Sequence, residues 1–268
     1  MKVGIIGYGS MGKMMLWKFS QAGIVGREDL YVSNRTEEKL REASDIARIC
    51  SNKDLASACD IVFICVRPVD IGGILEEIRD DLKKDSLVIS LNGSITFEML
   101  ETKIRHKLAK VIPSVTAEIN KSQTLVSYNG LVNDEDKNTL KELLACIGDV
   151  IELPEDEMGM GSELVSCMPG FIASIFDVVC QSAKKHTDIP YEQVVKMVLN
   201  TMSATGDLML RNDMSFEDVV TRVATKGGIT QEGTKVVYEM FPETADKLFE
   251  NTLAKRHMTA ENAKKNFG

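Results

Sequence analysis

The chain has 268 residues, of which 44% are hydrophobic and 27% are charged. That composition is typical of a soluble globular protein and excludes disordered, collagen-like and coiled-coil chains. The formal net charge of −8 provides no basic surface of the kind that non-specific nucleic-acid binding requires. The length predicts one large domain or two ordinary ones.

The start of the chain lacks the charged region, apolar run and cleavage site of a signal peptide. No later run approaches the roughly eighteen uninterrupted apolar residues that a membrane-spanning helix requires. The six cysteines include no C-x-x-C pair, and the three histidines have no partner at metal-ligand spacing. We therefore expect a cytoplasmic protein with reduced thiols, no metal site and no association with membranes.

Short apolar runs alternate with helical patterns through the first half of the chain. Strands are expected at 2–6, 30–33, 61–66, 87–91, 110–112, 124–128 and 150–153. Helices are expected at 13–22, from about 37, at 71–82, 97–104 and 136–147. Strands that are apolar on both faces and alternate with helices predict a doubly wound parallel sheet in an α/β fold.

After Pro154 the pattern becomes helical throughout. Helices are expected at 162–185, 190–211, 216–224, 231–240 and 245–265, and no strand-like run appears. We predict a Rossmann-type domain over residues 1–153 and an all-helical domain over residues 154–268. The large apolar surface of the helical half suggests that it is buried against a second copy of the chain.

The first strand leads into the sequence Gly7-Tyr8-Gly9-Ser10-Met11-Gly12, which has the form G-x-G-x-x-G. Between a buried strand and a helix, the first glycine permits a tight turn and the second lets the backbone approach a pyrophosphate. The third lets helix and strand pack closely, and the helix N-terminus favours phosphate. We expect these six residues to bind a dinucleotide; the alternative is a glycine-rich turn without a ligand.

The second strand ends in Ser33-Asn34-Arg35-Thr36. An NAD site usually has an acidic residue here to hold the ribose hydroxyls, whereas a guanidinium suits a 2′-phosphate. NADP(H) is therefore predicted over NAD. The alternative is that Arg35 is only a surface residue beside the next helix.

These motifs, with Val66-Arg67-Pro68 after the third strand, resemble the cofactor domain of pyrroline-5-carboxylate reductases. Residues 223–230, V-A-T-K-G-G-I-T, resemble that family's V-T-S-P-G-G-T-T signature. The resemblance implies a homodimer or higher homo-oligomer whose interleaved helices form the substrate pocket. It also implies a set of cofactor-binding residues: Gly7, Tyr8, Gly9, Ser10, Met11, Gly12, Asn34, Arg35, Thr36, Asn52, Val66, Arg67 and Pro68.

On the substrate side the resemblance places Thr230 beside the imine nitrogen and gives the carboxylate to Gly227 and Gly228. Thr225, Met168 and Pro169 complete the expected substrate site. A Gly-Gly pair before a helix exposes successive N–H groups, which form a small anion site. The alternative for Thr230 is helix capping alone, because a threonine at the N-cap normally satisfies a backbone donor.

Three segments depart from the family pattern, all on the substrate side: Ile112-Pro113-Ser114, the segment 165–171 with Cys167-Met168, and Lys226 with Ile229. The leading hypothesis is an NADPH-dependent reductase of a cyclic imino acid, making L-proline from 1-pyrroline-5-carboxylate. Positioning of a hydride donor and a protonated imine requires no acid–base pair, and none stands out. The alternatives are a non-catalytic or regulatory NADP-binding paralogue and a β-hydroxyacid dehydrogenase, which would need a G-x-x-x-N-x-x-K pattern near 162–185 that is absent.

Overall fold

The computed structural model describes residues 1–265 and 267. The chain forms two compact units, one of Met1–Pro169 with Leu253–Gly268 and one of Gly170–Thr252. The domain boundary expected after residue 153 stays a prediction.

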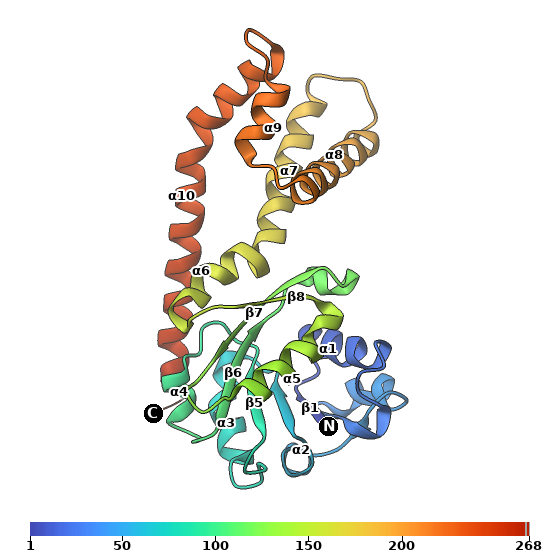
Figure 1. Ribbon diagram of the computed structural model, residues 1–268, viewed down its shortest axis with the longest axis vertical. Helices are drawn as coiled ribbons and strands as arrows, with labels where there is room; N and C mark the ends of the chain where they lie inside the picture. Colours follow the sequence, from blue (N-terminus) through green and yellow to red (C-terminus); the bar gives the residue numbers. More distant parts are fainter. Residues whose placement is uncertain (266, 268) are drawn as a thin grey trace. The chain divides into compact units, whose positions relative to one another are not determined.

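The first unit is built on one eight-stranded sheet with the order β3-β2-β1-β4-β5-β6-β7-β8 (Figure 1). Its strands are β1 (Val3–Ile6), β2 (Leu30–Ser33), β3 (Arg48–Ile49), β4 (Ile61–Ile64), β5 (Leu87–Ser90), β6 (Lys107–Ile112), β7 (Ser122–Tyr128) and β8 (Gly148–Glu152). Neighbouring strands are parallel except β6 and β7, which are antiparallel. The predicted doubly wound sheet is confirmed with one correction: the link from β6 to β7 is too short for the crossover that a parallel pair needs.

Five helices of this unit connect successive strands, and α6 follows the last strand. They are α1 (Ser10–Gln21), α2 (Asn52–Ala58), α3 (Pro68–Ile78), α4 (Phe97–Glu101), α5 (Asp134–Leu144) and α6 (Met158–Ser162). Short 3-10 turns are η1 (Arg27–Asp29), η2 (Glu37–Ala43), η3 (Val115–Ile119), η4 (Ala145–Ile147) and η5 (Glu155–Glu157), and η6 (Glu163–Cys167) is π-helical. The segment after Glu37 is therefore 3-10 rather than α-helical, and α2 was not predicted.

Apolar side chains cover both faces of the sheet, because successive strand residues point to opposite sides. On one face Ile5 and Phe63 pack with residues of α1, η2 and α5. On the other, Ile6 and Ile64 pack with residues of α2, α3, α4 and the end of the last helix, α10 (Ile229–Lys264), including Ala263. Each such side chain contributes about 1.5–3 kcal/mol when fully buried. The two layers leave the carboxyl ends of β1, β4, β5 and β6 at one edge, where ligands bind in doubly wound sheets.

The second unit is entirely helical. It contains most of α7 (Met168–Lys184), then α8 (Tyr191–Asn212), α9 (Phe216–Val223) and the first part of α10 (Ile229–Lys264). The prediction of separate helices at 231–240 and 245–265 is wrong, because α10 continues through Pro242. A proline removes one backbone hydrogen bond, and the helix resumes because the bonds on either side remain.

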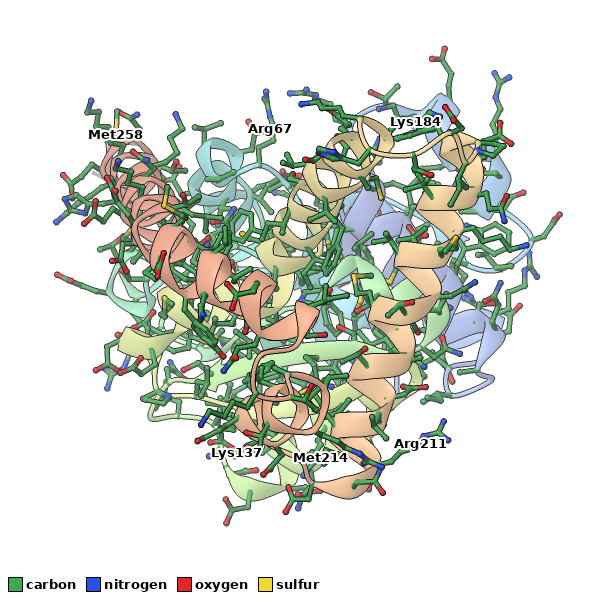
Figure 2. All side chains as sticks on the ribbon, turned by 90° about the horizontal axis from the view of Figure 1, so that it is seen from above. Arg67, Lys137, Lys184, Arg211, Met214 and Met258 are labelled. Atoms are coloured by element: carbon green, nitrogen blue, oxygen red, sulfur yellow. The ribbon has the colours of Figure 1, made fainter. Side chains whose placement is uncertain are left out.

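The second unit buries little of its apolar surface. Within Gly170–Thr252 only Cys180 and Val194 are buried, whereas Leu210 is 85% and Phe216 80% exposed. Figure 2 shows side chains standing out from these helices, with Arg211 near the end of α8 and Met214 just beyond it. A small unit needs a buried core to be stable, so we expect another surface to bury these apolar faces.

One helical stretch, Glu155–Lys184, is long and apolar enough to cross a membrane by length and composition. The most apolar part of this stretch is only 11% buried. The stretch contains Glu163 and Asp177, so it is not an uninterrupted apolar run of the kind that the sequence was expected to lack. Contiguous exposed apolar surface is also what a protein interface presents.

Candidate functional site

The turn between β1 and α1 depends on two of its glycines. Gly7 has φ +102°, and a Cβ there would lie 2.7 Å from the carbonyl oxygen of Cys65. A Cβ on Gly12 would lie 2.0 Å from the carbonyl oxygen of Gly7. Around Gly9, by contrast, no atom lies within 4 Å of the Cβ position. The fold thus requires the first and third glycines, and the second borders open space of the kind that a pyrophosphate needs.

The N-terminus of α1 is suited to an anion. Gly9 is its N-cap, no side chain caps it, and its first turn contains no acidic residue. Ser10 is exposed and Met11 half-buried. The Tyr8 side chain is buried, and its hydroxyl accepts a hydrogen bond from the Trp17 indole at 3.0 Å. Tyr8 is therefore a packing residue, and the uncapped N–H groups of the helix remain for a phosphate.

The loop after β2 is joined directly to this turn. The Tyr8 backbone N–H donates to Asn34 Oδ1 at 3.0 Å, and Asn34 Nδ2 donates to the Thr36 carbonyl at 2.9 Å. The exposed Arg35 and Thr36 line a cavity of about 790 Å³ together with Glu37, Glu38, Arg41, Ser44 and Ile49. Arg41 supplies a second guanidinium to this cavity. It was not predicted from the sequence, because Arg35 and Arg41 line one cavity only once η2 has folded.

Asn52 lies beside the end of β2. It is the first residue of α2 rather than part of a loop. Its Oδ1 accepts from Ser33 Oγ at 2.6 Å, and its Nδ2 donates to Glu77 Oε2 at 2.9 Å. These bonds hold the Asn52 amide beside the end of β2, and Arg35 lies just after that strand.

The residues after β4 also reach the glycine turn. Val66 Cγ1 lies 2.9 Å from the position of a Cβ on Gly7. Arg67 is the N-cap of α3 and forms an ion pair with Asp70 at 2.9 Å, and Pro68 begins the helix. The structure therefore places the predicted cofactor residues after the carboxyl ends of β1, β2, β3 and β4.

The Gly-Gly loop of the second unit differs from the expected anion nest. Gly227 has φ +74°, and its N–H donates to Gln231 Oε1 at 2.8 Å. The N–H of Gly228 donates to the carbonyl of Thr225, also at 2.8 Å. Both predicted donors are thus engaged within the loop.

Thr230 does not cap a helix, so the capping interpretation is wrong. Helix α10 begins at Ile229, which places Thr230 inside its first turn. Within residues 1–265 and 267 its hydroxyl forms no hydrogen bond, and the residue is exposed. The hydroxyl is therefore available to a ligand.

Met168 and Pro169 follow the π-helical segment η6. Proline lacks the N–H that would bond to the carbonyl of Val165, and such a loss widens the preceding turn. Met168 and Pro169 are both half-buried. They belong to the first unit, whereas Thr225, Gly227, Gly228 and Thr230 belong to the second.

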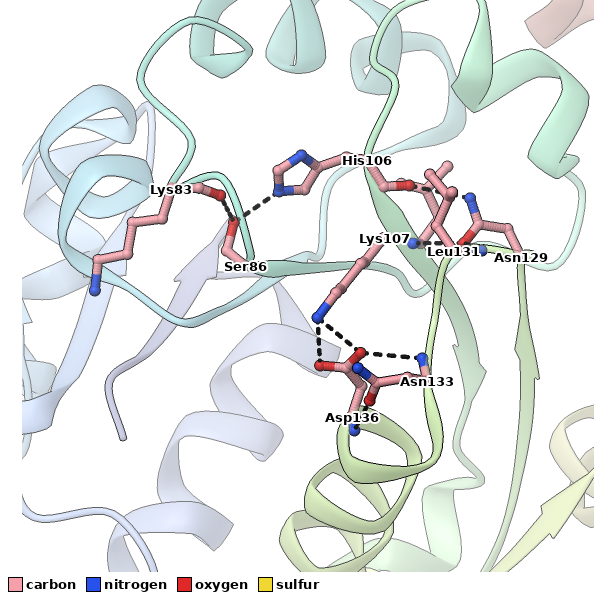
Figure 3. Close-up of polar contacts among 9 residues, drawn as sticks. Lys83, Ser86, His106, Lys107, Asn129, Leu131, Asn133 and Asp136 are labelled. Atoms are coloured by element: carbon pink, nitrogen blue, oxygen red, sulfur yellow. Dashed lines mark hydrogen bonds and ion pairs between the residues drawn. The ribbon is translucent and has the colours of Figure 1, made fainter.

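A serine–histidine contact lies at the opposite, amino edge of the sheet (Figure 3). Ser86 Oγ donates to the Lys83 carbonyl at 2.9 Å, so at its 2.9 Å contact with His106 Nε2 it accepts from the ring. A nucleophilic serine must instead donate to a base. Asn129 Nδ2 also donates to the His106 carbonyl, at 3.0 Å. This cluster joins the starts of β5 and β6 and is structural.

The His106 cluster predicts a loss of stability in acid. Burial lowers the pKa of His106 from its ordinary 6.5, and the neighbouring Lys107 adds to this effect. Hydrogen bonds to the backbone of Lys83 and Ser86 and the charge of Asp85 oppose it only in part. The unfolded chain therefore binds the proton first, so stability is full above pH 6.5 and falls as the pH drops below it. Thermal unfolding of His106→Gln should show a smaller decrease in Tm between pH 7 and pH 5 than the unsubstituted protein. Equal decreases would contradict this role.

Comparison with known proteins covers both units. Residues 2–93 match the family model described as NADP oxidoreductase coenzyme F420-dependent, and residues 155–258 match pyrroline-5-carboxylate reductase dimerisation. Crystal structures of similar fold include 1-pyrroline-5-carboxylate reductase from Streptococcus pyogenes (TM-score 0.85, 22% identity, covering 96% of this chain and 98% of that one). Pyrroline carboxylate reductase from Plasmodium falciparum with NADP bound has a TM-score of 0.83 at 21% identity, covering 100% and 98%.

Curated relatives match over nearly the whole length. ComE operon protein 4 of Bacillus subtilis (strain 168) is 27% identical over 271 residues, covering 100% of this chain and 99% of that protein. Pyrroline-5-carboxylate reductase 3 of the same strain is 30% identical over 264 residues, covering 97% of each chain. With this identity over its full length, the chain belongs to the pyrroline-5-carboxylate reductase family.

Proposed function

We propose that this protein is an NADPH-dependent reductase that converts 1-pyrroline-5-carboxylate to L-proline. The observation that carries the proposal is the turn from Gly7 to Gly12, with open space at its second glycine and an uncapped helix start. Full-length similarity to a reductase of that name supports the substrate. NADPH would supply a hydride for the carbon of a protonated cyclic imine, which is already electrophilic.

On the cofactor side, the N–H groups at the start of α1 would hold the pyrophosphate. Arg35 and Thr36, with Arg41 on the same cavity, would hold the 2′-phosphate. Asn52 would contact the adenine ribose, and Val66 and Pro68 would line the nicotinamide side. Glu37 and Glu38 line the cavity as well, so the two guanidinium groups must offset their charge.

On the substrate side, the free hydroxyl of Thr230 would hydrogen-bond the imine nitrogen and orient the ring. Gly227 and Gly228 would receive the carboxylate by exchanging their bonds to Gln231 and Thr225 for bonds to the ligand. Positioning by these groups is the protein's main contribution, because the reaction needs no side chain to abstract a proton.

The protein would act as a homodimer or larger homo-oligomer. The dimerisation family model covers residues 155–258, and this region includes the exposed apolar side chains of the second unit. A second copy of the chain would bury them. Such burial would also account for the exposed apolar helix, so no membrane is needed to explain it. The match to the dimerisation family model begins at residue 155, which supports a domain boundary close to residue 153.

The second candidate is a non-catalytic or regulatory NADP-binding relative. It is favoured by the altered segments Ile112-Pro113-Ser114 and Cys167-Met168 and by Lys226, all on the substrate side. The full-length similarity to ComE operon protein 4, a relative not named as a reductase, points the same way.

One experiment separates the two candidates. NADPH oxidation is followed with 1-pyrroline-5-carboxylate and its six-membered homologue, beside a fluorescence titration of NADPH alone. The reductase proposal expects imine-dependent oxidation, whereas saturable NADPH binding without turnover on either imine would support the non-catalytic candidate.

Arg35→Ala tests the cofactor preference. Loss of a charge-assisted hydrogen bond to the 2′-phosphate should weaken NADPH binding by about 10- to 100-fold and leave NADH within about twofold. Lys39→Ala is the matched control, because Lys39 is a neighbouring exposed cation that does not line the cavity. An equal loss for NADPH and NADH on titration would refute the 2′-phosphate role.

Thr230→Ala tests the substrate side. Removal of a hydroxyl that bonds the imine nitrogen should lower kcat/KM by about 10- to 100-fold without changing NADPH affinity. Thr230→Ser keeps the hydroxyl and should restore most of the activity. Unchanged steady-state kinetics in the alanine variant would remove Thr230 from the site.

A further inference from the structure

Two charged side chains from distant parts of the chain meet within the first unit. Arg256, on α10, donates to Glu163 Oε1 from Nε at 3.1 Å and from Nη2 at 2.7 Å. Its Nη2 also donates to Ser162 Oγ at 3.0 Å. The Glu163 side chain is 1% exposed and that of Arg256 is 19% exposed. The guanidinium is therefore fixed on one side, and only part of it reaches solvent.

This pair lies at the edge of the sheet where ligands bind. Gly93 follows β5, and a Cβ there would lie 2.8 Å from Arg256 Nη1 and 3.0 Å from Ile112 Cδ1. Ile112 ends β6, and β5 pairs with β4, which leads into Val66. Because neighbouring strands lie about 4.8 Å apart, Arg256 sits roughly one strand from the residues expected to line the nicotinamide.

Two polar atoms of the pair lack partners. Glu163 Oε2 is buried and accepts no hydrogen bond from the described residues. Arg256 Nη1 also donates none within 1–265 and 267, but unlike Glu163 Oε2 it is not fully buried. Nε and Nη2 are both engaged, and Nη2 also lies 4.0 Å from Cys167 Sγ. A buried acceptor without a donor is uncommon in native proteins and usually marks a missing partner. A partner that serves both atoms of the pair would donate to the carboxylate and accept from the guanidinium.

A primary carboxamide has both of these groups, since its NH₂ donates and its oxygen accepts. Glu163 also begins the π-helical segment η6, and π-bulges are frequent at functional sites.

We propose that Arg256 and Glu163 bind the carboxamide of the cofactor's nicotinamide ring. Nη1 donates to the amide oxygen, and Oε2 accepts from the amide NH₂. Ser162 and Gly93 serve as positioning residues: the serine bonds the guanidinium, and the glycine leaves room for it. The inference rests on the proposed NADPH-dependent function and adds the group that would hold the reacting end of the cofactor.

The test compares NADPH with its reduced 3-acetylpyridine analogue, which keeps the carbonyl oxygen and replaces NH₂ by a methyl group. The unsubstituted protein should bind NADPH about tenfold or more tightly than the analogue, because only NADPH can donate to the carboxylate. In Glu163→Gln this ratio should fall to within about twofold. The double variant Glu163→Leu/Arg256→Met removes the whole pair and should lose the ratio without leaving a buried charge.

Two controls separate binding from folding. Adenosine 2′,5′-bisphosphate has no nicotinamide, so its affinity should be the same in every variant. Glu155→Gln breaks a second, largely buried ion pair, Lys110–Glu155 at 3.0 Å, and should destabilise the protein while keeping the NADPH-to-analogue ratio. A Glu163→Gln protein that keeps the unsubstituted ratio would overturn the inference. An unsubstituted protein that shows the ratio but reduces no imine would overturn the proposed function alone.

Discussion

Gly12→Ala is expected to lower NADPH affinity by about 100-fold or more and to destabilise the fold by about 1–3 kcal/mol. The new Cβ would lie 2.0 Å from the carbonyl oxygen of Gly7, which is backbone and cannot rotate away. Either α1 or the phosphate-binding turn must move. NADPH titration and thermal unfolding of the same preparation measure the two effects.

Two further glycines make this prediction specific. Gly9→Ala places its Cβ in open space, so the Tm should be unchanged while NADPH affinity falls, because the methyl group takes room that the pyrophosphate needs. Gly26 also has nothing within 4 Å and lies outside the site, so Gly26→Ala should change neither. If Gly9→Ala binds NADPH normally, the turn is a structural feature without a ligand.

Glu155→Gln is expected to lower the free energy of unfolding by about 2–4 kcal/mol. Lys110 is 2% exposed, and its Nζ lies 3.0 Å from Glu155 Oε1, which also accepts from the Phe97 N–H at 2.7 Å. Burial lowers the pKa of Lys110, and the Glu155 carboxylate opposes that effect. Without this carboxylate a buried ammonium would lack its counter-charge. Urea unfolding measures the change.

A surface ion pair provides the matched control. Lys137 and Glu152 also lie close, at 2.6 Å, but their side chains are 32% and 54% exposed. Glu152→Gln should therefore cost less than about 1 kcal/mol. Similar costs for Glu155→Gln and Glu152→Gln would show that burial does not set the strength of the Lys110 pair.

The sheet could be predicted because its strands are continuous apolar runs. β2 was predicted at its observed bounds, Leu30–Ser33. β3 was missed because Arg48–Ile49 is two residues long, exposed and paired only with β2. The antiparallel direction of β7 depends on the length of one connection, which apolar patterning does not show.

The helical half was predicted less accurately. A proline normally suggests the end of a helix, and Pro242 led to two expected helices where α10 is continuous. The start of α10 also depends on Gln231, whose side chain bonds the N–H of Gly227. Contacts of this kind between a side chain and the backbone decide helix ends but leave no clear pattern in a single sequence.

The cofactor turn could be predicted because all of its residues are adjacent in the chain. The Arg256–Glu163 pair could not, since these residues are 93 positions apart and meet only through folding. Arg41 was also missed, because it joins Arg35 on one cavity only when η2 folds. Sequence motifs thus revealed the local part of the site, and the long-range polar contacts required the structure.

The proposed reduction of a cyclic imine by NADPH is tested most directly by the product of the reaction. The purified protein is incubated with NADPH and 1-pyrroline-5-carboxylate, and L-proline is quantified against NADPH consumed. The proposed function predicts one L-proline for each NADPH oxidised. Saturable NADPH binding with no L-proline formed would contradict it.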